Sequence, residues 1–126
     1  MLYKISQNKL SSMRQKKVLE RQVQELVGDN LEHLLGLERV CYEFTVEGKR
    51  IDILAFDREA NAPVIIELKK ENSSGLFDQG MEYFHLLSNR KADFLIKINE
   101  VLSIPAQLSA VDWSASKVIF IGRNFD

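Results

Sequence analysis

The chain lacks the residues for a disulfide scaffold or a structural zinc site. Its 126 residues include a single cysteine, Cys41, and two isolated histidines, His33 and His85. One cysteine cannot form an internal disulfide, and structural zinc sites need a cluster of cysteine and histidine ligands. A chain of this length buries enough apolar surface to fold without such staples, so we expect a single domain over residues 1–126.

Other absences narrow the class of protein further. With two prolines and six glycines, the chain is neither collagen-like nor of low complexity. No run approaches the ~20 apolar residues of a membrane span, and the N-terminus has no apolar signal segment. We therefore expect a soluble, cytoplasmic protein with no membrane partner. Seventeen basic against eighteen acidic residues give a net charge of −1, which disfavours bulk attraction to nucleic acid but allows a local basic patch.

The N-terminal end is where basic residues gather. The first nineteen residues contain no Asp or Glu and five cations, namely Lys4, Lys9, Arg14, Lys16 and Lys17. We divide the chain into a basic N-terminal arm, 1–16, and a core, 17–126. The arm has two interpretations, a solvated and partly ordered segment or a segment that contacts phosphates, because clustered cations release counterions from a polyanion.

Apolar periodicity predicts the elements of the core. A helix is expected from Lys17 to about Leu35, ending at Gly36, with a core stripe of Leu19, Val23, Leu26, Val27, Leu31 and Leu34. Three strands should follow at 41–46, 50–57 and 63–69, the last two apolar on both faces and therefore central. A second helix is expected over 76–88, with a stripe of Phe77, Gly80, Phe84 and Leu87.

The last third of the chain is expected to complete the sheet. We predict a strand at 92–98, a short helix around Pro105 and a final strand at 117–122. The order of helix, three strands, helix and strand predicts an α/β fold with a mixed central sheet flanked by helices.

Two carboxylates interrupt the apolar central strands. Asp52 lies between Ile51 and Ile53, and Glu67 follows Val64-Ile65-Ile66 in the next run. Burying a carboxylate without a partner costs several kcal/mol. If the two runs form a hairpin centred near residue 60, Asp52 lies opposite residue 68 and one position from Glu67.

Two carboxylates brought together need a cation, and Mg²⁺ or Mn²⁺ prefers oxygen ligands. The Leu68 carbonyl is a plausible third ligand. Lys69 projects from the same face as Glu67 and could orient a metal-bound water. The alternative is an ion pair of Lys69 with Asp52 or Glu67 that holds two strands together.

Two helices offer further candidates. Glu20 lies about 50° from the mean direction of the first helix's apolar stripe and is expected to face the sheet, where it can bind a metal or its water. The alternative is a Glu20 at the rim of the packed face. Gln79 and Tyr83 form an i,i+4 pair that could hold a phosphate or water, or they could be an ordinary solvated amide and half-buried phenol.

Asp52 and Glu67-x-Lys69 on consecutive strands, after a helix with an inward Glu20, resemble the PD-(D/E)XK nuclease superfamily. The phrases agree more closely with an uncharacterised family within it, related to the catalytic domains of archaeal-type mismatch endonucleases: Leu19-Glu20-Arg21-Gln22-Val23-Gln24, Arg50-Ile51-Asp52-Ile53-Leu54-Ala55-Phe56-Asp57, Val64-Ile65-Ile66-Glu67-Leu68-Lys69 and Asp78-Gln79-Gly80-Met81-Glu82-Tyr83. The Pro of the motif's name is absent, since Ile51 precedes Asp52.

The resemblance implies a restriction-endonuclease-like core of αβββαβ order. It implies that Asp52 and Glu67 bind the metal, that Lys69 orients the water, that Glu20 is an auxiliary ligand, and that Gln79 and Tyr83 complete the active site. The expected activity is Mg²⁺-dependent hydrolysis of DNA in a restriction, repair or defence setting, by a homodimer. The alternatives are a catalytically silent module that binds nucleic acid or protein, and a metal-free structural subunit with internal ion pairs.

Overall fold

The computed structural model describes residues 2–69 and 75–122, with side chains described from residue 14 onward except that of residue 16. Its helices and strands are, in order, α1 (Leu2–Asp29), α2 (Leu31–Leu35), β1 (Glu38–Val46), β2 (Lys49–Asp57), β3 (Ala62–Lys69), α3 (Leu76–Asn89), α4 (Lys91–Leu102) and β4 (Lys117–Gly122). Two single-turn 3₁₀ helices, η1 (Leu108–Ala110) and η2 (Trp113–Ala115), precede β4.

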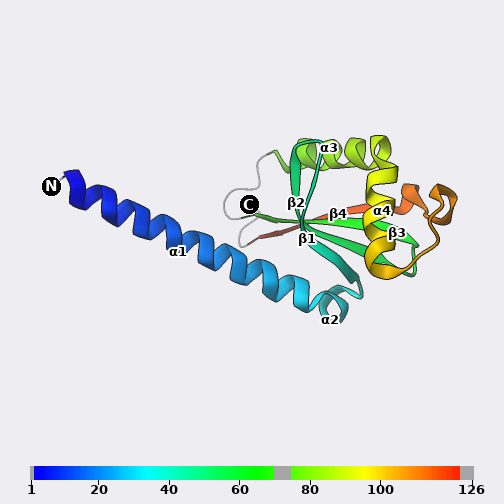
Figure 1. The fold of residues 1–126 in the computed structure, drawn as a ribbon, viewed down its shortest axis with the longest axis horizontal. Helices are drawn as coiled ribbons and strands as arrows, with labels where there is room; N and C mark the ends of the chain where they lie inside the picture. The colour runs from blue at the N-terminus through cyan, green and yellow to red at the C-terminus, as the bar shows by residue number, and fades with distance from the viewer. Residues whose placement is uncertain (1, 70–74, 123–126) are drawn as a thin grey trace.

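The four strands form one mixed sheet in the order β1-β2-β3-β4 (Figure 1). Two hairpin connections make β1, β2 and β3 antiparallel, whereas β4 returns parallel to β3 after the crossover through α3 and α4. This arrangement confirms the predicted α/β fold with a mixed sheet flanked by helices. It also confirms the three strands after the first helix and the last strand at 117–122.

Helices cover both faces of the sheet, which is why the central strands are apolar on both sides. One core packs β2 and β3 against α3 and α4, and its largest buried side chains include Phe56, Ile65 and Phe94. The other core lies under the end of α1 and α2 and includes Val27, Leu31, Ile53 and Ile66. Alternate residues of β3 therefore point to different helical layers.

The first helix is longer than expected and its apolar stripe is only partly buried. The backbone of the predicted arm is helical from Leu2 onward, and residues 2–16 contain neither Pro nor Gly to interrupt it. The helix breaks before α2, which ends at Gly36 as expected, in the left-handed conformation. Of the predicted stripe, Val27 and Leu31 are buried, whereas Leu19, Val23, Leu26 and Leu34 are exposed. The N-terminal part of α1 continues well past the end of the sheet and has no sheet surface to pack against (Figure 1). Leu26 and Leu34 lie next to the buried Val27 and Leu31 in the packed part of the chain, on the solvent side of their helices.

The predicted strand at 92–98 is wrong, because this segment belongs to helix α4. Phe94, Leu95 and Ile98 are buried while Ile96 is exposed, which is helical spacing that a short apolar run conceals. The short helix expected around Pro105 is replaced by η1 and η2, which begin after that residue.

Helix α3 lies where it was predicted but rotates its buried face. Gly80 and Leu87 are buried as expected, together with Tyr83 and Leu86. Phe77 is 79% exposed and Phe84 is also exposed, so the predicted core stripe is half wrong. Within the described ranges, every helix is too short or too polar to cross a membrane.

The last turn of α1 is held against β1 through a close approach at Gly28. A Cβ atom at this position would overlap the ring and hydroxyl of Tyr42. That ring is fixed because its hydroxyl donates to Asp29 Oδ1 at 2.7 Å and accepts from Arg39 Nη1 at 3.0 Å. Glycine is therefore required here for packing, although it is a poor helix former.

We predict that Gly28→Ala lowers the free energy of unfolding by about 1–2 kcal/mol, because overpacking outweighs the ~1 kcal/mol gain in helix propensity. In a Tyr42→Ala background the same change is expected to become stabilising. Urea unfolding of the four proteins measures both effects. A Gly28→Ala cost that persists without the Tyr42 ring would contradict the packing argument.

Candidate carboxylate site

Asp52 and Glu67 lie across from each other on the two central strands. The paired residues of β2 and β3 run from Asp57–Ala62 to Ile53–Ile66, and the same register continued by one step sets Asp52 opposite Glu67. The expected register was one residue off, because it placed Asp52 opposite Leu68. The observed register makes the two carboxylates direct cross-strand neighbours.

At this level the ladder between β2 and β3 is made by side chains. The backbone N–H of Asp52 donates to Glu67 Oε2 at 3.1 Å, and the backbone N–H of Leu68 donates to Asp52 Oδ2 at 2.8 Å. Each carboxylate therefore reaches across and accepts from the opposite strand. Bonds of this kind stabilise the ionised form of a carboxylate and fix its orientation.

The backbone of Asp52 is also held from the other side of the sheet. Its carbonyl accepts from Gln24 Nε2 of α1 at 2.7 Å, and Gln24 is 9% exposed. The neighbouring strand is irregular at the same level: Glu43, between the pairs Tyr42–Ile53 and Phe44–Ile51, has a φ of 53°. A left-handed non-glycine residue inside a strand costs about 1 kcal/mol or more, and such strain concentrates at functional sites.

Helix α3 supplies the closest side-chain partner of the pair. The hydroxyl of Tyr83 donates to Glu67 Oε1. Glu67 is buried beneath α3, with 7% of its surface exposed. Burial, followed by the proximity of Asp52, raises the pKa of Glu67 from 4.5 to about 7 despite the bond from Tyr83. Burial and the neighbouring carboxylates likewise raise the pKa of Tyr83. The phenol thus stays protonated and remains a donor.

Two lysines flank this group of residues over aromatic rings. Lys69 projects from the same strand as Glu67, and its Nζ lies 5.8 Å from the centroid of the Phe120 ring. Lys49 Nζ lies 5.9 Å from the centroid of the Tyr83 ring and forms an ion pair with Glu82. Within residues 2–69 and 75–122, Lys69 forms no ion pair with Asp52 or Glu67. The alternative in which Lys69 neutralises either carboxylate is therefore not observed.

Two predicted site residues lie next to this group without joining it. Glu20 is half-buried and precedes Gln24 by one helical turn, so it lies on the same side of α1. In the described part of the chain, no three Asp, Glu, His or Cys side chains lie close enough together to hold a metal. Glu20 is therefore not placed as a third acidic ligand beside Asp52 and Glu67. Gln79 is half-buried one turn before Tyr83 on α3, as its spacing predicted.

The donor set nevertheless suits a hard divalent cation. Asp52 and Glu67 offer two carboxylates, and the Leu68 carbonyl lies between the side chains of Glu67 and Lys69 in the chain. Mg²⁺ usually binds through one or two carboxylates and keeps several waters, which a substrate phosphate can replace. A cation between the carboxylates would also remove the repulsion that raises the pKa of Glu67.

Sequence reasoning missed two residues of this group. Gln24 lies one turn after Glu20 and about 90° from the mean direction of the predicted apolar stripe, so the helical spacing gave no signal that it faces the sheet. Lys49 follows the turn between β1 and β2 and carried no signal, because only the fold brings it over the ring of Tyr83.

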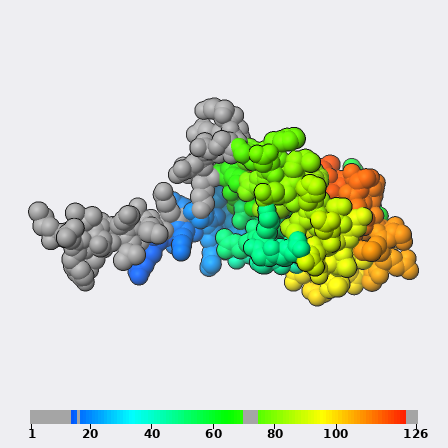
Figure 2. Space-filling view, turned by 90° about the horizontal axis from the view of Figure 1, so that it is seen from above, coloured from blue at the N-terminus to red at the C-terminus, as the bar shows by residue number. Residues whose placement is uncertain are grey.

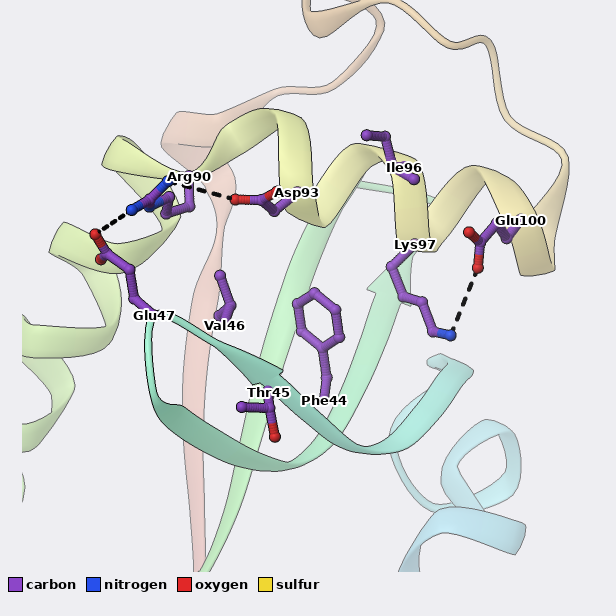
Figure 3. Close-up of a pocket in the computed structure, with 9 residues that line it drawn as sticks. All are labelled: Phe44, Thr45, Val46, Glu47, Arg90, Asp93, Ile96, Lys97 and Glu100. Atoms are coloured by element: carbon purple, nitrogen blue, oxygen red, sulfur yellow. Dashed lines mark hydrogen bonds and ion pairs between the residues drawn. The ribbon is translucent and has the colours of Figure 1, made fainter.

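A hollow elsewhere in the structure is a weaker candidate for the functional site. Figure 3 shows this hollow of about 440 Å³ between β1 and α4, with Phe44, Val46, Glu47, Arg90, Asp93 and Lys97 among its lining residues. Its charges satisfy one another, since Arg90 pairs with Glu47 at 2.6 Å and with Asp93 at 4.0 Å. The pair of a buried Glu67 and a half-buried Asp52, two like charges side by side, is the stronger functional signal.

Comparison with known proteins gives limited further information. No family model matches the chain. An uncharacterised protein of Haemophilus influenzae is 40% identical over 126 residues, which cover 99% of this chain and 42% of that protein. The chain thus spans less than half the length of this curated relative.

Two solved structures resemble the chain at low identity. A repair endonuclease from Pyrococcus abyssi is 16% identical with a TM-score of 0.44, covering 85% of this chain and 38% of its own. An EndoMS–dsDNA complex is 14% identical with a TM-score of 0.45, covering 85% and 36%.

The raised pKa of Glu67 predicts a pH-dependent stability in the presence of a chelator. A carboxyl whose folded pKa is raised contributes stability that is complete below pH 4.5 and lost as the pH rises through about 7. We expect the wild-type protein to lose about 2 kcal/mol between pH 5 and pH 8, after allowance for solvent screening. Glu67→Gln should remove this loss and be the more stable protein at pH 8.

Urea unfolding at the two pH values, with EDTA present, measures the difference. Glu100→Gln on the exposed face of α4 is the matched control and should keep the wild-type pH dependence. An unchanged pH dependence in Glu67→Gln would mean that burial and the nearby Asp52 do not raise the pKa of Glu67 as the geometry requires.

Proposed function

We propose that this chain is a metal-dependent phosphodiesterase that hydrolyses DNA, with Mg²⁺ or Mn²⁺ held by Asp52, Glu67 and the Leu68 carbonyl. The observation that carries the proposal is the reciprocal bonding of the two carboxylates, which fixes both at the place where β2 and β3 part. Glu20 is the proposed auxiliary ligand, acting through water. Cleavage of both DNA strands would require two copies of the site, which supports a homodimer.

The charges around the site suit a phosphodiester. When bound, the metal would lower the pKa of a water and neutralise the charge that develops on the phosphate. Lys69, on the same face as Glu67, would orient that water. Lys49, over the ring of Tyr83, is within reach of a substrate oxygen on the same side. The hydroxyl of Tyr83 would hold Glu67 in its ligating orientation, and Gln79, one turn before it, would contact water or phosphate.

The arrangement argues against a silent module. A buried carboxylate beside a half-buried one destabilises a protein that has no cation for them, and in the described ranges Lys69 does not pair with either. Apolar residues in both positions would serve a binding module or structural subunit better. A site that holds both carboxylates in place by backbone donors is consistent with metal binding as its function.

We predict that the wild-type protein binds Mn²⁺ and that Asp52→Asn and Glu67→Gln each weaken binding by tenfold or more, because each removes half of the acidic ligands. Isothermal titration calorimetry with Mn²⁺ measures the affinities. Asp93→Asn, an exposed acid of α4, is the matched control and should bind as the wild type does. Equal affinities for wild type and Asp52→Asn would contradict the proposed ligands.

Lys69 should separate metal binding from hydrolysis. We predict that Lys69→Met keeps Mn²⁺ affinity within about threefold but lowers the rate of phosphodiester hydrolysis by 10²-fold or more, which is typical of losing a residue that orients a water or proton. Cleavage of labelled duplex and single-stranded DNA measures the rate, with Lys97→Met of α4 as the control. A wild-type protein that binds the metal and leaves DNA uncut would favour the silent module.

A further inference from the structure

Helix α1 carries three exposed cations on one side. Arg14, Lys17 and Arg21 are spaced i, i+3 and i+7, so at about 100° per residue they lie within about 60° of one another around the helix. We call these three residues the basic stripe. It begins in the part of the chain without acids, since the first Asp or Glu is Glu20.

The stripe lies close to the carboxylate site along the helix. Gln24 fixes the position of α1 relative to Asp52 through its 2.7 Å bond to the Asp52 carbonyl. At about 1.5 Å per residue, Arg21, Lys17 and Arg14 follow at roughly 5, 10 and 15 Å from that point. Figure 1 shows α1 continuing past the end of the sheet where β3 and β4 finish, and in Figure 2 the blue end of the described side chains extends beyond the body.

The distribution of charge along the chain means that binding a polyanion would depend on such a stripe. Five of the seventeen cations precede Glu20, so the rest of the chain carries all eighteen acids and only twelve cations. A body with six excess acids repels DNA at long range, and the carboxylate pair adds to this locally. Cations along α1 are therefore the part of the chain best suited to draw a DNA strand toward the site.

The spacing of the stripe agrees with a phosphate backbone. Steps of three and four residues place the cations about 4.5 and 6 Å apart along the axis, and flexible side chains can match phosphates separated by similar distances. Glu25 and Asp29 follow the stripe toward the sheet, but Asp29 is paired with Arg39 at 2.6 Å. The attractive region thus covers the portion of α1 that leaves the body.

We propose that the basic stripe of Arg14, Lys17 and Arg21 binds the sugar–phosphate backbone of a DNA strand and leads it to the carboxylate site. This proposal rests on the proposed function, because it assigns the substrate contact of the same site. The contacts are electrostatic and independent of sequence, since a helix side lined with cations reads phosphates and not base edges.

The test compares two variants with the same change in charge. One replaces the stripe by glutamine (Arg14→Gln, Lys17→Gln and Arg21→Gln), and the control replaces Lys91, Lys97 and Lys117, which lie on α4 and at the start of β4. Fluorescence anisotropy with a labelled 30-mer duplex and its single strand, in EDTA and a series of KCl concentrations, measures affinity. The rate of bis(p-nitrophenyl) phosphate hydrolysis with Mn²⁺ measures activity on a substrate that is too small to reach the stripe.

We expect the stripe variant to bind DNA at least tenfold more weakly at 0.1 M KCl, with a salt slope reduced by about 2–3, one contact's worth per cation. The control should keep most of the affinity and slope, and both variants should hydrolyse the small substrate at the wild-type rate. Equal losses in both variants, or none in the stripe variant, would overturn the stripe. A wild-type protein that binds DNA but hydrolyses neither substrate would overturn the proposed function and leave the stripe as a binding surface.

Discussion

The site depends on two hydrogen bonds in which the carboxylates of Asp52 and Glu67 each accept from a backbone N–H of the opposite strand. In an ordinary antiparallel pair, backbone N–H groups of one strand donate to carbonyls of the other. Here Asp52 N–H donates to a side-chain oxygen of Glu67, and Leu68 N–H donates to a side-chain oxygen of Asp52. The strands part without leaving these donors unsatisfied, and two carboxylates become part of the ladder. Their orientation is therefore fixed by the sheet itself, which few surface carboxylates can match.

The helices on both faces hold this opening in place. Tyr83 of α3 donates a hydrogen bond to Glu67 on one side of the sheet, and Gln24 of α1 donates one to the Asp52 carbonyl on the other. The parallel strand β4 places Phe120 beside Lys69, so the lysine lies over an aromatic face near the carboxylates. Each flanking element thus contributes one polar or aromatic contact to a site whose charged residues come from two strands.

The parts of the fold that follow from short-range pattern were predictable. Asp52 and Glu67 stand out because they interrupt apolar central strands, and alternation places Lys69 on the face of Glu67. The hairpin register was missed by one residue, since turn type and loop length fix the register and the sequence places the ends of the loop only approximately. The segment 92–98 reads equally as a strand or a helix because its apolar run is short. The exposed Leu19 was assigned to the core because no local signal reports how far α1 extends beyond the sheet, and the exposed Leu26 because the predicted stripe was wider than the face that α1 buries.

Under the proposed function, the overall charge would be a poor guide to the substrate. A net charge of −1 conceals an N-terminal segment with only basic residues and a body with an acidic excess. A metal site built from carboxylates needs acids at its centre, and those acids repel the phosphates that must approach it. Placing the acids on two strands and the cations on a helix separates the two charges: Gln24 attaches α1 beside the carboxylates, and the cations begin one turn beyond. Attraction over long range and metal binding over short range can then be provided by neighbouring but distinct residues.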